Sequence, residues 1–308
     1  MFPAVKCIPQ FLAALCGLAG ALAVHAAQLP VLASILDGEA ALLRESGRFA
    51  VAEGVRLDSG DIVETGAQAR LLRLEFADGT IVDLGPATRA LVAPRLTGKG
   101  TAAPAPHLYV LQGWFKLITP AGGKGAPAAT ILTPSHALSE AAGQQVALSE
   151  PAGLQLFCEA GAATLQERIA KPAEPIRLKA GEYFSRLGSE KAALKPRPGP
   201  AFIQAVPRSF LDPLPSRAAL FKDREVVPKR TADLAYDDVA AWLSAESALR
   251  SQFVARWRAL ARRSDFRAGL VAHMRSHPEW DRIVFPEKYL PKRPPPTPGG
   301  PRPATSTY

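Results

Sequence analysis

Before position 190, apolar and polar residues alternate with a period of two, and turn-forming residues interrupt the alternation about every 8–12 residues. Leu72 and Leu74, for example, fall on one side of an extended chain, and Arg73 between them falls on the other. This segment shows no helical period. We therefore predict a mainly β N-terminal domain over residues 30–190, a sandwich, barrel or short solenoid of about a dozen short strands.

A turn at Asp78-Gly79 predicts a hairpin within this domain. A two-residue loop would place Leu74 opposite Asp83, whereas a three-residue loop with a bulge would place it opposite Leu84. We prefer the second arrangement, because it keeps the apolar residues of both strands on one face.

Two strand-like runs flank a further turn at Gln112-Gly113. If Phe115 faces the core, alternation exposes Trp114, and an exposed Trp can stack on a sugar ring or on a partner's side chain. Trp114 and Tyr109 are therefore candidate binding residues. The alternative is that the helical domain or another strand covers Trp114.

A helical period replaces the alternation in the C-terminal part of the chain. Apolar residues recur at helical spacing from Leu249 to Leu260, and Asp237-Asp238 and Ser264-Asp265 are typical helix starts. We predict a linker at 191–204, rich in Pro and Lys, and a small all-α domain at 205–288. A Pro-rich tail at 289–308 is expected to be disordered.

Charge is divided unevenly between the two parts of the chain. Residues 1–190 hold 16 Lys and Arg against 17 Asp and Glu, whereas residues 191–308 hold 21 against 11. Such asymmetry favours an anionic partner surface. Several arginines lie off the apolar helix stripes, and four of them are candidates for this surface: Arg256, Arg258, Arg262 and Arg263.

The first 26 residues have the pattern of a secretory signal peptide. Lys6 precedes an apolar run over 11–24, and cleavage after Ala26 would leave small residues at the −3 and −1 positions. The run is shorter than the ~20 residues that span a bilayer. We predict a periplasmic protein without a transmembrane helix in the mature chain, which disfavours nucleic acid as a partner. An uncleaved membrane anchor is the alternative.

The reactive residues of the sequence do not form a recognisable catalytic pattern, which disfavours an enzyme. Cys158 alone remains after cleavage, so no internal disulfide forms, and its apolar surroundings predict a buried thiol. His273 and His277 have the i,i+4 spacing of zinc ligands but lack the accompanying Glu. His136 and Cys158 lack an orienting third residue. We expect no catalytic residue, no cofactor and no metal.

The segment from Leu57 to Thr88 combines Gly-Asp, Thr-Gly and Asp-Gly turns with short apolar strands. Leu57-Asp58-Ser59-Gly60-Asp61-Ile62-Val63-Glu64-Thr65-Gly66 is followed by Phe76-Ala77-Asp78-Gly79-Thr80 and by Val82-Asp83-Leu84-Gly85-Pro86-Ala87-Thr88. In this pattern it resembles the FecR domain, an extracytoplasmic β module named after the ferric-citrate regulator. Leu178-Lys179-Ala180-Gly181-Glu182 is similar to the closing strand of the family. The resemblance covers roughly 45–190 and implies a periplasmic β module for binding or scaffolding.

Sigma regulators of that family carry a long cytoplasmic segment and a membrane helix before the module, and neither pattern is present here. We therefore expect a non-catalytic module that attaches to an envelope protein, or to an anionic envelope polymer or lipid surface. One alternative is an accessory of extracytoplasmic signalling that docks on a membrane partner. A second is an envelope hydrolase.

Overall fold

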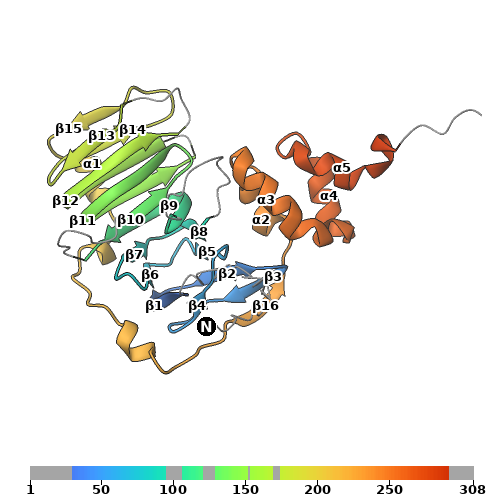
Figure 1. Cartoon of the computed structure of the whole chain (residues 1–308), viewed down its shortest axis with the longest axis horizontal. Helices are drawn as coiled ribbons and strands as arrows, with labels where there is room; N and C mark the ends of the chain where they lie inside the picture. The colour runs from blue at the N-terminus through green and yellow to red at the C-terminus, as the bar shows by residue number, and fades with distance from the viewer. Residues whose placement is uncertain (1–29, 95–105, 121–128, 152, 169–173, 291–308) are drawn as a thin grey trace, which may run out of the picture.

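The computed structural model describes residues 30–94, 106–120, 129–151, 153–168 and 174–290. Within them, strands dominate from Val31 to Lys195, and helices dominate from Tyr236 to Tyr289. The prediction of a mainly β region followed by a small helical region is therefore confirmed (Figure 1). The predicted signal peptide and nearly all of the predicted tail lie outside the described residues.

The strands of the N-terminal region form one continuous hydrogen-bonded sheet. They are β1 (Val31–Asp37), β2 (Ala40–Arg44), β3 (Gly47–Ala50), β4 (Arg56–Leu57), β5 (Ile62–Thr65), β6 (Leu71–Glu75), β7 (Ile81–Leu84), β8 (Arg89–Val92), β9 (Leu108–Ile118), β10 (Ala129–Leu132), β11 (His136–Glu150), β12 (Gly153–Glu167), β13 (Ile176–Lys179), β14 (Tyr183–Arg186) and β15 (Ala193–Lys195). The main path through the sheet is β15-β14-β12-β11-β10-β9-β8-β5-β2-β3, and β1, β4, β6, β7 and β13 pair beside it.

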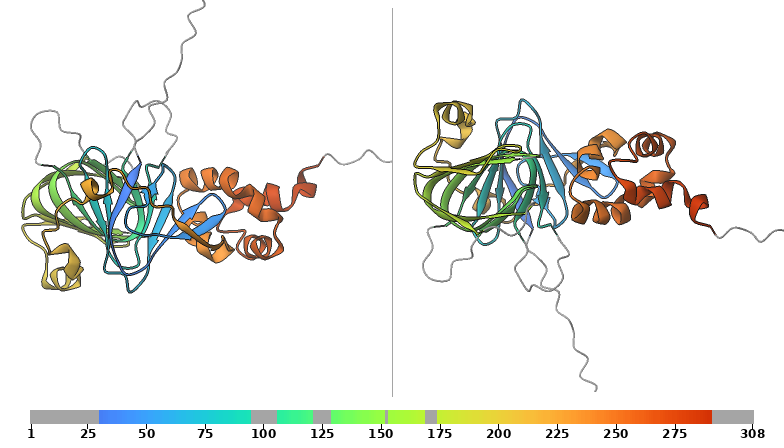
Figure 2. Two further views of the ribbon diagram at one scale, coloured as in Figure 1. Left: turned by 90° about the horizontal axis from the view of Figure 1, so that it is seen from below. Right: turned by 90° about the horizontal axis from the view of Figure 1, so that it is seen from above.

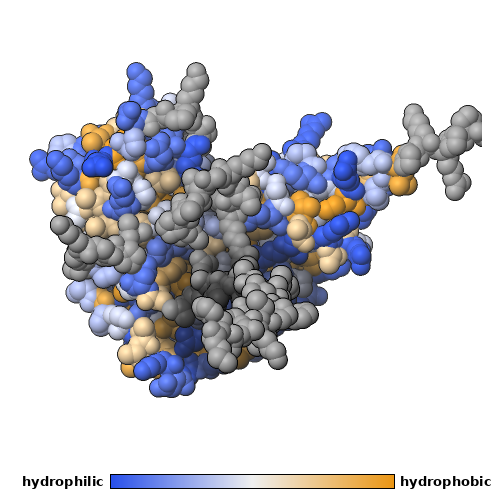
Figure 3. Space-filling view, in the orientation of Figure 1, coloured by the Kyte–Doolittle hydropathy of each residue, from blue (hydrophilic) through white to orange (hydrophobic). Residues whose placement is uncertain are grey.

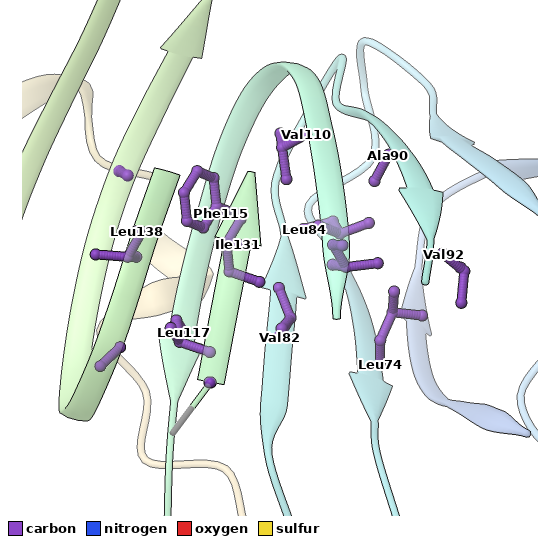
Figure 4. Close-up of a cluster of buried hydrophobic side chains, with 14 of the residues drawn as sticks. Leu74, Val82, Leu84, Ala90, Val92, Val110, Phe115, Leu117, Ile131 and Leu138 are labelled. Atoms are coloured by element: carbon purple, nitrogen blue, oxygen red, sulfur yellow. The ribbon is translucent and has the colours of Figure 1, made fainter. Parts of the chain in front are cut away.

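The sheet curls around one apolar core (Figure 2). Buried side chains from strands as distant along the chain as β1 and β14 belong to a single cluster. Figure 4 shows its middle part, where Leu74, Val82 and Phe115 point into the same space. Each such side chain contributes about 1.5–3 kcal/mol through burial, and the core contains no disulfide among the described residues.

Strand β9 joins the two halves of the sheet by bending sharply at Gly113. Its first half pairs with β8 and β10, and its second half pairs with β7 and β11. The prediction of a hairpin turn at Gln112-Gly113 is wrong, because the chain continues forward as one strand. Gly113 has a φ of +104°, a conformation that glycine adopts readily. Both a turn and a bend within one strand need a glycine at such a position, so the local sequence is the same in the two cases.

The hairpin at Asp78-Gly79 forms, but in a register two residues from the predicted one. Leu74 lies opposite Val82 instead of Leu84, and Arg73 lies opposite Asp83. A shift of two residues leaves every side chain on its face, so the expectation of one apolar face is confirmed although the offset is wrong. The observed register brings Arg73 and Asp83 together on the outer face of the sheet.

The chain between the sheet and the helices stays close to the β region. It contains α1 (Pro200–Ala205), η1 (Arg208–Phe210), η2 (Ala218–Phe221) and β16 (Lys229–Asp233). The predicted linker at 191–204 therefore holds β15 and most of α1, and Phe202 of α1 is buried against Trp114 and Tyr183. Residues 206–218, called the strap below, cross the outer face of β6, β7 and β9, and β16 then pairs with β3.

The helices form a compact group at one end of the β region (Figures 1 and 2). They are α2 (Tyr236–Leu243), α3 (Ser247–Trp257), η3 (Arg258–Arg262), α4 (Ser264–Ala272), η4 (Pro278–Trp280), α5 (Asp281–Val284) and η5 (Pro286–Tyr289). The predicted helix starts at Asp237-Asp238 and Ser264-Asp265 are confirmed to within one residue. Among the described residues, no helix has the length and apolar character needed to cross a bilayer.

The helical group shares a core with the outer face of β2, β5, β8 and β9. Leu43, Ile62 and Tyr109 of the sheet belong to the same buried cluster as Trp242 and Trp257. The indole Nε1 of Trp242 donates to Glu64 Oε1 at 2.8 Å, and that of Trp257 donates to the Glu45 carbonyl at 2.9 Å. Because indole N–H groups are satisfied on the sheet, the helices are fixed to it by both apolar and polar contacts.

Candidate anion-binding site

Arginines gather around one hollow of about 690 Å³ on the helical group. Its arginines come from α3, η3, α4 and α5: Arg256, Arg258, Arg262, Arg267 and Arg282. Its remaining lining is small or apolar, and no Asp or Glu of the described residues lines it. Five positive charges around one concavity whose lining holds no carboxylate create a local potential that attracts anions.

The apolar stripe of α3 determines how its arginines are placed. Leu249, Phe253 and Trp257 are buried at spacings of four residues, and Arg256 beside this stripe is partly buried and reaches back to the sheet. The tighter turn of η3 follows directly and keeps Leu260 inside. Arg258 and Arg262 lie on the outward side of η3, four positions apart.

Arg256 lies at the inner wall and is held by the β region. Its guanidinium donates to the Leu43 carbonyl at 2.8 Å and to the Gly60 carbonyl, and it lies 5.3 Å from the Trp257 ring centroid. Burial lowers the pKa of Arg256, the nearby Asp61 carboxylate acting in the opposite direction. With its donors directed to carbonyls, Arg256 fixes the position of the site on the sheet and contributes charge to it.

Arg267 and Arg282 form the opposite wall, and each is oriented by a neighbour. Arg267 donates to the Val284 carbonyl and lies over the Phe285 ring. Arg282 is exposed and lies 4.9 Å from the Tyr289 ring centroid. Stacking of this kind holds a guanidinium in place while leaving its edge N–H groups free to bind.

Arg258 and Arg262 are the least constrained donors of the site, since Arg282, which is also exposed, is stacked on the Tyr289 ring. Both side chains are exposed, and within the described part of the chain neither makes a hydrogen bond or an ion pair. A guanidinium has five N–H donors in a planar fork that matches a phosphate or carboxylate in a bidentate manner. The arrangement therefore suits a multivalent anion, bound by the two free arginines and held in the field of the other three.

Three of the four predicted arginines are brought together here, and one is not. Arg263 instead pairs with Asp265 and donates to the Leu234 carbonyl at 3.1 Å, so it serves the helix packing. Arg267 and Arg282 complete the site without having been among its predicted members. The sequence does place Arg267 off the apolar stripes, but only the folding of α4 and α5 against η3 shows where it lies.

The predicted aromatic binding residues are both buried. Trp114 is 9% exposed because α1 covers it, with the Phe202 ring centroid at 5.4 Å. An exposed Trp114 is therefore ruled out and the alternative of a covered Trp114 holds, although α1 covers it and not the helical domain or another strand. Its predicted orientation, opposite to the core-facing Phe115, is confirmed. Tyr109 is fully buried beneath the helical group with the Arg168 guanidinium 5.6 Å from its ring, and burial raises its pKa.

The residues considered for catalysis or metal binding either lie far from one another or already contact other side chains. Cys158 is a free, buried thiol, as predicted, and burial raises its pKa. It pairs with Gln145, nine positions along β11 from His136. His277 is buried with its Nε2 3.0 Å from the Tyr236 hydroxyl, while His273 stacks on the Tyr236 ring. The described residues contain no group of three His, Cys, Asp or Glu arranged to hold a metal ion.

Figure 3 shows the surface of one side of the molecule. Where the side chains are coloured, hydrophilic ones lie beside hydrophobic ones on both the β region and the helical group.

Comparison with known proteins identifies no family. No protein-family model matches the chain, and no curated protein matches it. Two crystal structures of a candidate anti-sigma factor from Parabacteroides distasonis ATCC 8503 are similar to part of it. One has a TM-score of 0.35 at 11% identity, and the other has a TM-score of 0.34 at 12% identity. Each alignment covers 44% of this chain and 59% of the solved one, so the chain spans about three fifths of their length.

Proposed function

We propose that this chain is a non-catalytic, exported binding module that attaches to a phosphate-bearing anionic surface or polymer of the cell envelope. The observation that carries the proposal is the hollow lined by five arginines and no carboxylate. The exported location rests on the signal-like pattern of residues 1–26, and the β region is proposed to be a FecR-like module that supports the helical group.

The β region supports the site mechanically. Arg256 reaches from the hollow to the Leu43 and Gly60 carbonyls, so the arginine cluster is attached to β2 and to the Asp58–Asp61 turn. An ion pair in which Arg168 Nη2 donates to both Glu246 oxygens, at 2.8 and 2.9 Å, ties the helices to the sheet at a second point. A binding site held on rigid elements loses little conformational entropy when its ligand binds.

Reversing the charge of the two free arginines is expected to abolish attachment to anionic membranes. Each arginine near such a surface contributes about 1 kcal/mol of attraction, so Arg258→Glu with Arg262→Glu should weaken binding roughly 30-fold from lost attraction alone, before repulsion is added. Co-sedimentation with phosphatidylglycerol vesicles measures this, with phosphatidylcholine vesicles as the neutral reference. Binding of the unaltered chain should also fall steeply between about 0.05 and 0.2 M salt.

A double variant elsewhere separates the site from overall charge. Arg224→Glu with Arg275→Glu changes the net charge equally at two exposed arginines that do not line the hollow. If both double variants lose vesicle binding to the same extent, the binding does not depend on a localised site. Adding soluble polyphosphate distinguishes the two sources of the ligand: competition is expected if a phosphate polymer is bound, whereas a lipid headgroup site should respond mainly to vesicles.

The second candidate is an accessory of extracytoplasmic signalling that docks on a protein partner. It rests on the resemblance to the FecR domain and needs no anionic ligand. A pull-down from envelope extract that retains one stoichiometric protein, equally with the unaltered chain and with the Arg258/Arg262 double variant, would favour it.

A further inference from the structure

A row of charged side chains lies buried on the outer face of β6, β7 and β9. Arg73 and Asp83 are each 1% exposed, Glu75 is 5% exposed and Lys116 is 7% exposed. Neighbouring residues on these strands, such as Leu74 and Phe115, point to the opposite face and form the core. The charged row is therefore on what would be the solvent face of the sheet, and the strap is what covers it.

The charged row binds the main chain of the strap. Arg73 Nη1 donates to the Leu214 carbonyl at 2.6 Å and to that of Pro215 at 3.3 Å, and Lys116 Nζ donates to the Phe210 carbonyl at 2.7 Å. In the other direction, Glu75 accepts from the backbone N–H groups of Arg217 at 2.8 Å and Ala218 at 3.3 Å. Both signs of charge thus match donors and acceptors of the strap backbone.

Side chains of the strap also contact the sheet, through one apolar anchor and a few polar groups: Ser209 donates to the Arg70 carbonyl at 2.6 Å, Ser216 donates to Glu75, and Arg217 pairs with Glu53 at 3.2 Å. Phe210 is 1% exposed and packs in one cluster with Trp114, close to Gly85, whereas Leu211 beside it is 67% exposed. Pro207, Pro213 and Pro215 restrict the backbone of the strap, which reduces the entropy lost when it is laid on a surface. Backbone contacts with one aromatic anchor are the contacts by which domains recognise extended peptides.

The charged row suits a strap that can dissociate better than one that stays bound. If the strap stayed bound, apolar residues of similar volume would stabilise this face more than charged ones do, because the desolvation of buried charges offsets the gain from their pairing. An exposed apolar face, by contrast, would be unfavourable whenever the cover left. The Arg73–Asp83 pair at 2.7 Å and the Lys116–Glu159 pair at 2.7 Å remain paired in either state, so the face stays compatible with water.

We propose that this face is a polypeptide-binding surface that the strap occupies in cis, and that its partner is a proline-containing polypeptide with an aromatic anchor. The strap is then a built-in competitor, since its attachment to the same chain gives it a high effective concentration. An incoming polypeptide binds by displacing residues 206–218, while β16 and the helical group remain attached to the sheet.

The test uses a fluorescent peptide with the sequence of residues 206–218, whose binding is followed by anisotropy. Phe210→Ser with Leu214→Ser should loosen the strap of the full chain, and this variant should bind the peptide at least tenfold more tightly than the unaltered chain. Ile203→Ser with Leu211→Ser changes two exposed residues and should bind like the unaltered chain. Adding Lys116→Met to the loosened variant should remove most of the gain, as should a peptide carrying Phe210→Ala.

Equal peptide binding by the loosened and unaltered chains would overturn the proposal. If the loosened variant does not fold, hydrogen exchange of the unaltered chain decides. The Arg217 and Ala218 amides should exchange faster than those of β9. If these two amides exchange only when the whole protein unfolds, the strap does not dissociate from the folded sheet. Because the peptide lacks excess negative charge, the Arg258/Arg262 double variant should bind it unchanged, which separates this result from the anion site.

Discussion

Gly113→Ala is expected to destabilise the fold by about 4 kcal/mol. The φ of +104° costs a residue with a Cβ roughly 1–3 kcal/mol, and insertion into a packed site costs a similar amount. A Cβ at this position would lie 2.4 Å from Thr88 Cα and 2.4 Å from Thr88 Oγ1. Thr88 cannot withdraw easily, because its backbone N–H donates to Thr65 Oγ1 at 2.8 Å and its hydroxyl donates to the Trp114 carbonyl at 3.0 Å.

Urea unfolding of the substituted chain measures this loss, and Gly60→Ala is the matched control. Gly60 has a φ of +89°, but nothing lies within 4 Å of the Cβ it would gain. It should therefore show only the conformational part, about 1–2 kcal/mol. If the two substitutions prove equally destabilising, the close approach of β9 to Thr88 is not what requires a glycine at the corner.

The same corner shows what local sequence can and cannot predict. Alternation correctly placed Phe115 and Trp114 on opposite faces, because the period of two is a property of the strand alone. Whether the chain turns back or continues at Gly113 depends on strands that pair with β9 from far along the sequence. Glycine permits either outcome, so a turn and a corner could not be distinguished.

The covered face of the sheet was missed for a related reason. Proline residues near 196–215 are typical of a linker, because proline cannot join a β ladder. It can still cover the face of a sheet, where its carbonyl accepts a hydrogen bond, as the Pro215 carbonyl does from Arg73. The buried residues Phe202 and Phe210 are not part of a regular apolar repeat. Their burial could therefore not be predicted from hydrophobic periodicity.

The arginine site was predicted in part. Arg256, Arg258 and Arg262 lie close together in sequence on one helical segment, and helical geometry suffices to place them off the apolar stripe. Arg282 lies more than one helix away in the sequence, and its position beside the hollow depends on how α5 packs against η3. Periodicity predicts which side of a helix faces solvent, but not which other helix lies next to that side.

His136 is expected to make the fold sensitive to acid, by about 3 kcal/mol between neutral pH and pH 4. Burial lowers its pKa to about 4, and the nearby Arg186 guanidinium acts in the same direction. The unfolded chain takes up a proton near pH 6.5, whereas the folded chain resists until about pH 4. The stability from the neutral imidazole is therefore complete above about pH 6.5 and decreases as the pH falls toward the folded value. Urea unfolding at intervals from pH 7 to pH 4 measures the loss.

His136→Asn isolates this contribution, because an amide can keep the hydrogen bond that the imidazole Nδ1 shares with Ser135 Oγ at 2.8 Å and carries no proton to gain. Its stability should change much less over the same interval. His277, whose pKa burial also lowers, acts in the same direction in both chains, and Glu64, whose pKa burial raises, acts in the opposite one. Burial acts to raise the pKa of Glu75 but hydrogen bonds lower it overall, so its contribution starts to be lost below about pH 4.5, and equally in both chains. The difference between the two chains therefore belongs to His136. Parallel pH profiles would mean that the site beside Phe184 accepts the imidazolium without penalty, despite the positive charge of Arg186.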